Sequence, residues 1–174
     1  MKRIVVGVLV LIAFAAVIVL VGFALPRDHT AASTIRLSVP TDSVWPVVRD
    51  MARYPEWWGS VRRMESVPSG PNREVWRQTD RNGTMPFEVV REEPGSVLVT
   101  RILDEGLPFG GTWTYEVRPE AGGTLVRVTE DGSVYNPVFR FLSRFVFGHY
   151  ATMDDYLAAL GGRFGDNASP VHVQ

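Results

Sequence analysis

Six consecutive segments between residues 61 and 132 alternate apolar and polar side chains and are separated by short turn sequences. Alternation with a period of two is typical of a strand that buries one face. The breaks PSGPN, RNG, PG and PEAGG supply the glycine, proline and asparagine that tight hairpins require. The pattern therefore predicts an antiparallel meander of six strands, at residues 61–67, 73–80, 84–93, 96–103, 111–118 and 124–132.

Further elements flank these six strands. Residues 33–39 alternate and predict a seventh strand, and residues 41–59 predict two short helices after it. A helix of about 24 residues is expected to begin at Pro137 and to end at Gly161. An antiparallel sheet with one apolar face needs a cover, and this terminal helix is the long element available. We expect an α+β fold in which a seven-stranded antiparallel sheet wraps around the C-terminal helix.

Residues 4–25 form 22 consecutive positions without a charged side chain. As a helix this run is about 33 Å long, enough to cross the hydrocarbon core of a membrane. Lys2 and Arg3 precede it, so the positive-inside rule predicts a cytoplasmic N-terminus and an extracytoplasmic domain. A cleaved signal peptide is the alternative, but its apolar core is usually only about 7–15 residues.

The sequence thus divides into four parts. We expect residues 1–25 to be a single-pass signal anchor in the cytoplasmic membrane, since VGFALPRD is a poor cleavage site. Residues 26–32 then form a tether, residues 33–165 form the folded domain, and residues 166–174 form a flexible tail.

Composition excludes several classes of function. The part beyond residue 25 has 16 Arg, no Lys and 19 Asp plus Glu, so it has no general excess of positive charge for nucleic acid. The chain has no cysteine, which excludes thiolate nucleophiles and sulfur metal ligands. His29 lies in the predicted tether and His172 in the predicted tail, so neither is expected to join His149 at a metal. We expect no metal and no cofactor.

Three stretches, VPTDSVWPVVRDMARYPEWW, PFGGTWTYEV and TEDGSVYNPVFRF, precede the long terminal helix. Together they resemble the SRPBCC superfamily of START-like helix-grip proteins, and within it the polyketide cyclase/dehydrase and lipid-transport group, in a membrane-anchored bacterial version. The likeness covers about residues 33–165. It implies a deep cavity between the sheet and the terminal helix, and a ligand such as a lipid, sterol or polyketide, with catalysis in only some members.

Two inward polar side chains are candidates for chemistry. Strand parity carries Glu130 to the inner face with Trp113 and Tyr115, where a carboxylate needs a partner, solvent or a raised pKa. Glu130 at the rim of the sheet is the alternative. His149 is either a satisfied core histidine or a cavity group that orients a ligand or moves a proton. On a helical wheel it shares an apolar face with Leu142, Phe145, Val146, Met153, Tyr156 and Leu160.

Aromatic residues outside the strands are candidates for the mouth of the cavity. Trp57 and Trp58 are adjacent on a short helix and point about 100° apart, so one is expected to be a buried plug and the other to face the mouth or the membrane. Phe109, in the loop EGLPFGG, either folds over the mouth or packs locally, and Phe147 falls on the polar side of the terminal helix. The candidate ligand-binding residues are Trp57, Trp58, Trp76, Met85, Phe87, Phe109, Trp113, Tyr115, Val128, Leu142, Phe145, His149 and Met153.

Three functions are open at this point. The first is a membrane-anchored module that binds a hydrophobic or amphipathic small molecule, lipid-like or polyketide-like. The second is a cyclase/dehydrase-type enzyme in which His149, Glu130 and Tyr115 perform acid/base chemistry. The third is an interaction module with a filled core. The sequence has no nucleophile elbow, zinc-protease motif or phosphate loop, which favours binding over catalysis and leaves the ligand and the oligomeric state unassigned.

Overall fold

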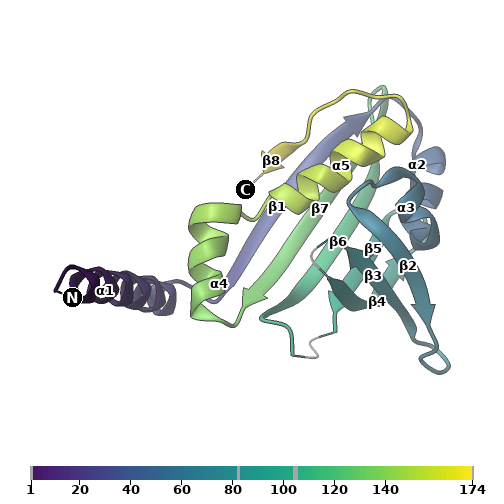
Figure 1. The fold of residues 1–174 in the computed structure, drawn as a ribbon. Helices are drawn as coiled ribbons and strands as arrows, with labels where there is room; N and C mark the ends of the chain where they lie inside the picture. The colour runs from purple at the N-terminus through teal and green to yellow at the C-terminus, as the bar shows by residue number, and fades with distance from the viewer. Residues whose placement is uncertain (1, 82, 104–105, 174) are drawn as a thin grey trace.

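The computed structural model describes residues 2–81, 83–103 and 106–173 and has the predicted α+β architecture (Figure 1). Asn82 of the RNG turn and Glu105 of the EGLPFGG loop lie outside the described residues. The helices are α1 (Lys2–Ala24), α2 (Thr41–Arg49), η1 (Met51–Arg53), α3 (Tyr54–Trp57), α4 (Pro137–Leu142), the π-helix η2 (Ser143–Phe147) and α5 (Ala151–Arg163). The strands are β1 (Asp28–Leu37), β2 (Val61–Val67), β3 (Glu74–Asp80), β4 (Thr84–Glu93), β5 (Val97–Ile102), β6 (Phe109–Glu120), β7 (Gly123–Val134) and β8 (Val171–Val173).

The strands form one antiparallel sheet in the order β2-β3-β4-β5-β6-β7-β1-β8. The predicted meander is confirmed, because each of β2 to β6 pairs with the next strand in the chain. β6 and β7 are longer than predicted and stay paired from Glu120 and Gly123 to Phe109 and Val134. Phe109 is therefore the first residue of β6 and not part of a loop, which corrects its predicted setting.

The core lies between the sheet and two helices. Figure 1 shows α5 lying across β1 and β7, and α2 packs against β6 and β7. Burial of each large side chain in this layer stabilises the fold by about 1.5–3 kcal/mol. Among the described residues, the hydrophobic side chains that are 0% exposed are Val44, Val48, Leu98, Val126, Val128, Met153, Tyr156, Leu157 and Leu160.

The sheet has eight strands where seven were predicted. The additional strand, β8, comes from the predicted flexible tail and pairs with β1 opposite residues 32–34. His172 within β8 stacks on Tyr150 at 3.8 Å and its Nε2 lies 2.7 Å from Asp154 Oδ2. A strand of three residues carries no usable periodicity, so the sequence pattern did not predict it.

β1 begins earlier than predicted, at Asp28. Only residues 25–27 separate it from α1, so most of the predicted tether belongs to the sheet. His29 consequently lies opposite Gly132 of β7 and not in a linker, which corrects its exclusion from the site.

The predicted continuous terminal helix is broken. α4 continues into the π-helix η2, and Gly148 then interrupts the helical backbone with φ 73° and ψ 176° before α5 begins. A positive φ of this kind costs glycine little and other residues more. Phe145, predicted to face the interior, is 59% exposed, so that placement is wrong.

Helix α1 projects from the domain (Figure 1). Most of its large apolar side chains are exposed. Within the described residues it is the one helix long and apolar enough to cross a membrane. Its C-terminal turn packs against α4, where a Cβ on Gly22 would lie 1.9 Å from the carbonyl oxygen of Pro137. A glycine at position 22 therefore permits this close contact.

Candidate functional site

The end of the sheet beside α2 and α3 is closed by aromatic side chains. Trp58 is 3% exposed, and its Nε1 donates a hydrogen bond of 2.6 Å to Asp155 Oδ2. Its ring lies 5.1 Å from that of Tyr156 and 5.9 Å from that of Tyr54. Trp57 is half-buried and packs edge-to-face on the same two tyrosines. Trp58 is therefore the buried member of the pair, and neither ring opens an entrance at this end.

A polar cluster lies at the other end of the sheet, beside α1 and α4. Glu130 of β7 accepts a hydrogen bond of 2.7 Å from Nε1 of Trp113, which is paired with it on the neighbouring strand β6. The Oε1 of Glu130 lies 3.0 Å from His29 Nε2. The ring of His29 lies 3.9 Å from that of His149. The predicted inward position of Glu130 beside Trp113 is confirmed, and its carboxylate has the partners that burial requires.

Gly132 makes room for the histidine in this cluster. A Cβ at Gly132 would lie 2.4 Å from His29 Cε1 and 3.0 Å from Glu130 Oε1. Because a side chain there would overlap the imidazole, the glycine lets the ring lie flat over β7 and reach Glu130. Residues His29, Glu130, Trp113 and His149 are called the His–Glu cluster below.

The electrostatic setting lowers the pKa of His149 below its ordinary value. Burial is the main cause, since it disfavours the charged imidazolium. The adjacent His29 and Arg144 also lower this pKa, and Glu130 opposes them. His149 is therefore neutral at neutral pH, with one ring nitrogen able to donate a hydrogen bond and the other to accept one.

This lowered pKa predicts a pH dependence of stability. The contribution of His149 to the free energy of unfolding should be complete above the ordinary histidine pKa of 6.5. It should decrease as the pH falls below that value, because His149 binds a proton more strongly in the unfolded chain than in the folded one. Chemical denaturation between about pH 5 and 8 measures this dependence. His149→Gln should flatten the profile. An unchanged profile in His149→Gln would contradict the assignment.

The two histidines of the cluster line a hollow of about 260 Å³. We call this hollow the junction pocket, because its walls come from the end of α1, the start of β1, the end of β7 and the α4–η2 segment. Apolar side chains share the lining with histidines, arginines and the carboxylate of Asp28. Its residues are Leu25, Pro26, Arg27, Asp28, His29, Val134, Arg140, Ser143, Arg144 and His149.

Arg140 fastens the wall of the junction pocket to α1. Its Nη1 donates to the carbonyl oxygens of Gly22 and Leu25 at 3.3 and 3.4 Å, and its Nη2 donates to that of Tyr135 at 3.0 Å. The carbonyl oxygens of Gly22 and Leu25, at the end of α1, have no partner within the helix, and a cation there also complements the helix dipole. A second, broader hollow of about 430 Å³ borders His29 on strands β1 and β7.

The other predicted site residues are either buried or half-buried. Val128 of β7 and Met153 of α5 are fully buried, and Phe87 and Tyr115 nearly so, so they belong to a packed core in this structure. Burial raises the pKa of Tyr115 well above its ordinary value, which keeps its hydroxyl protonated. The half-buried candidates are Trp57, Trp76, Met85, Phe109, Trp113, Leu142 and His149.

The junction pocket therefore does not lie between the sheet and the terminal helix, where a cavity was predicted. Side chains fill the layer beneath α5, and the pocket opens where the helix is interrupted, beside α1. Sequence reasoning missed His29, although the inward parity of Ile35 extends back through Ser33 and Ala31 to position 29. Within the described residues, no group of three or more acidic or histidine side chains has a metal-binding arrangement.

Comparisons with known proteins give one matching family model and several solved structures of similar fold. A protein-family model described as polyketide cyclase / dehydrase and lipid transport matches residues 28–160. Solved structures with a similar fold include the Zhui aromatase/cyclase from a Streptomyces species, with 16% identity over 79% of this chain and 94% of that chain and a TM-score of 0.64. A START superfamily protein from Mycobacterium smegmatis has 16% identity over 79% and 97%, with a TM-score of 0.61. No curated protein matches the sequence.

Proposed function

The chain belongs to the polyketide cyclase/dehydrase and lipid-transport family, and on that premise we propose that its domain binds a hydrophobic or amphipathic small molecule at a membrane surface. The junction pocket is the proposed site for the polar end of this molecule. Lipid-like and polyketide-like compounds both combine an apolar body with polar groups, and both fit this description.

The mixed lining of the junction pocket carries the proposal. Leu25 and Val134 offer apolar contact, His29 and His149 offer hydrogen bonds, and Arg144 offers positive charge. Small-molecule sites have this composition, with an apolar surface and a few placed polar groups. Because the pocket is smaller than the roughly 300–1,000 Å³ usual for whole ligands, it suits a head group better than a complete lipid.

The position of Trp113 indicates where the apolar body of the ligand would lie. Its indole nitrogen is bound to Glu130, and its half-buried ring lies 5.9 Å from the ring of Tyr115 on the inner face of the sheet. The half-buried Trp76 packs against the core opposite Phe87, and strand alternation places the half-buried Met85, two residues before Phe87, on the same face. A ligand held by the His–Glu cluster would therefore extend along this aromatic surface.

The membrane attachment rests on α1. A helix of 23 residues is about 34 Å long, and its large apolar side chains lie exposed in the structure. We propose that it is an uncleaved, single-pass anchor of the cytoplasmic membrane, with Lys2 and Arg3 on the cytoplasmic side and the domain outside. With only residues 25–27 between α1 and β1, the junction pocket would lie directly at the bilayer.

Photocrosslinking of a fatty acid that carries a diazirine tests the binding site. In nanodiscs containing the full chain, we expect crosslinked peptides from the start of β1, from η2 and around Trp113, because these border the proposed path. The control variant Asp42→Asn, on the distant helix α2, should crosslink as the original chain does. Crosslinks confined to α1 would mean that the fatty acid only samples the bilayer and would overturn the proposal.

Acid/base catalysis is a second candidate, favoured by the contact of His29 with both Glu130 and His149. A neutral imidazole beside a carboxylate-bound histidine can take up a proton from a bound polyketide and return it. Tyr115 is the weakest of the three predicted catalytic groups, because it is buried and stays protonated. Retained binding with lost turnover in His149→Ala and Glu130→Gln would support catalysis, and turnover unaffected by both changes would exclude this cluster as its source.

A further inference from the structure

The α4–η2 segment exposes an apolar surface that neither the core nor the junction pocket uses. Four of its side chains are well exposed: Phe139 at 41%, Phe145 at 59%, Val146 at 61% and Phe147 at 61%. Three of these side chains are consecutive, at positions 145–147, and a cluster of exposed apolar residues on a soluble domain marks a contact site. The interruption at Gly148 exposes them, because residues 137–147 no longer continue along the axis of α5.

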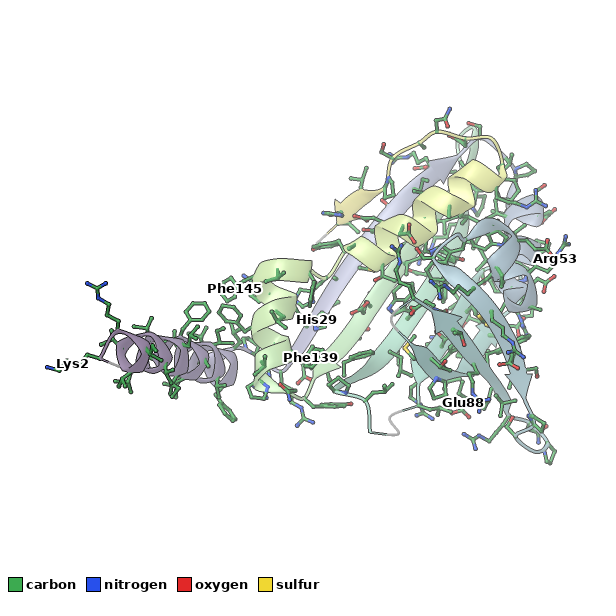
Figure 2. The ribbon with its side chains drawn as sticks, viewed as in Figure 1. Lys2, His29, Arg53, Glu88, Phe139 and Phe145 are labelled. Carbon is green, nitrogen blue, oxygen red and sulfur yellow. The ribbon has the colours of Figure 1, made fainter. Side chains whose placement is uncertain are left out.

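The placement of this surface points to its partner. In Figure 1, α4 lies crosswise at the end of α1, and contacts between the two helices hold it there. Figure 2 shows Phe145 on the side of the segment toward α1, and His29 on the side toward the sheet. A helix that crosses the end of a membrane-spanning helix lies along the membrane surface, so Phe145 would meet lipid on the side opposite the pocket.

The charges around the segment suit a lipid head-group region. Arg144 is exposed within η2, and Arg27 is exposed at the start of the domain, with its guanidinium 4.6 Å from the centre of the Tyr135 ring. Helices that lie in the interface combine such cations with an aromatic face that enters the head-group and acyl boundary by about 5–10 Å. The attachment of Arg140 to the end of α1 fixes the segment at this depth.

We propose that the α4–η2 segment lies on the lipid bilayer beside α1, with Phe145, Val146 and Phe147 inserted at the interface and the junction pocket facing the head groups. The proposal rests on the membrane anchor proposed above, but not on the identity of the ligand. It gives the pocket a route for a molecule that leaves the bilayer without crossing water.

Single cysteines test this proposal, because the chain has none of its own. The full chain would carry one fluorescent nitrobenzoxadiazole label, through Phe147→Cys or Phe145→Cys on the segment, Phe14→Cys in α1, or Ala158→Cys on the exposed side of α5. Each variant would be placed in vesicles of phosphatidylcholine and phosphatidylglycerol. Emission would be measured with a nitroxide lipid as the membrane quencher and with iodide as the aqueous quencher.

We expect labels at 145 and 147 to lose about half or more of their emission to a shallow nitroxide and to resist iodide, as interfacial side chains do. The label at 14 should respond to a deep nitroxide, and the label at 158 to iodide alone. Quenching of the label at position 147 by iodide, while the label at position 14 stays in lipid, would overturn the proposal and leave the membrane anchor intact. If neither quencher reached 147, a protein would cover the surface and the proposal would fail. If the label at position 14 also escaped quenching by the nitroxide lipid, both the interfacial placement and the membrane anchor would be wrong. A failure of ligand binding alone would appear only in the crosslinking experiment.

Discussion

Replacement of Trp58 by alanine is expected to lower the free energy of unfolding by about 3–5 kcal/mol, the range found for buried tryptophans. The ring is almost fully buried against Tyr54 and Tyr156, so its loss leaves a cavity at the closed end of the sheet. The change also removes the donor to Asp155. Denaturant unfolding of the full chain in nanodiscs, followed by circular dichroism, measures the effect.

Trp57→Ala is the matched control at the neighbouring position. Its ring is half-buried and packs on the same tyrosines, so a smaller loss of about 1–2 kcal/mol is expected. Neither change should alter crosslinking of the fatty acid at the junction pocket, which lies at the opposite end. Equal losses of stability in the two variants would contradict the assignment of Trp58 as the buried plug.

Gly132→Val is expected to weaken ligand capture at the junction pocket by about tenfold or more, equivalent to about 1.4 kcal/mol. The new side chain would overlap His29, whose ring must then leave Glu130 and His149. The diazirine fatty acid should lose crosslinks at β1 and η2 in proportion, while those on α1 persist.

Gly162→Ala controls for the replacement of a glycine as such. Nothing lies within contact distance of a methyl group at this exposed position of α5, so both capture and folding should be preserved. The circular dichroism spectrum of Gly132→Val separates a displaced histidine from a misfolded sheet. Undiminished capture in a folded Gly132→Val would show that the His29 contact is not needed.

The sheet was predictable because its strands depend on local patterns. Alternation and the turn sequences identified β2 to β7, and the positive φ of Gly95 and Gly122 at two hairpins shows why glycine stands there. The same parity placed Glu130 beside Trp113. The family resemblance agreed with these elements, and the family match over residues 28–160 bears it out.

The junction pocket was less predictable, because it depends on where regular elements stop. Small side chains at Ala31 and Ala32 obscured the start of β1, although both are buried, and so His29 was assigned to a linker. Gly148 within an otherwise helical pattern was the available signal for the break in the terminal helix. A wheel drawn through that glycine placed Phe145 inside, whereas the broken helix exposes it.

Native mass spectrometry of the full chain ejected from nanodiscs tests whether the junction pocket holds a ligand. We expect one small apolar or amphipathic molecule per chain, retained when the nanodisc lipid is exchanged and lost in Gly132→Val. A bare protein mass under all conditions, or the same adduct at the same occupancy in a folded Gly132→Val, would contradict binding at the junction pocket.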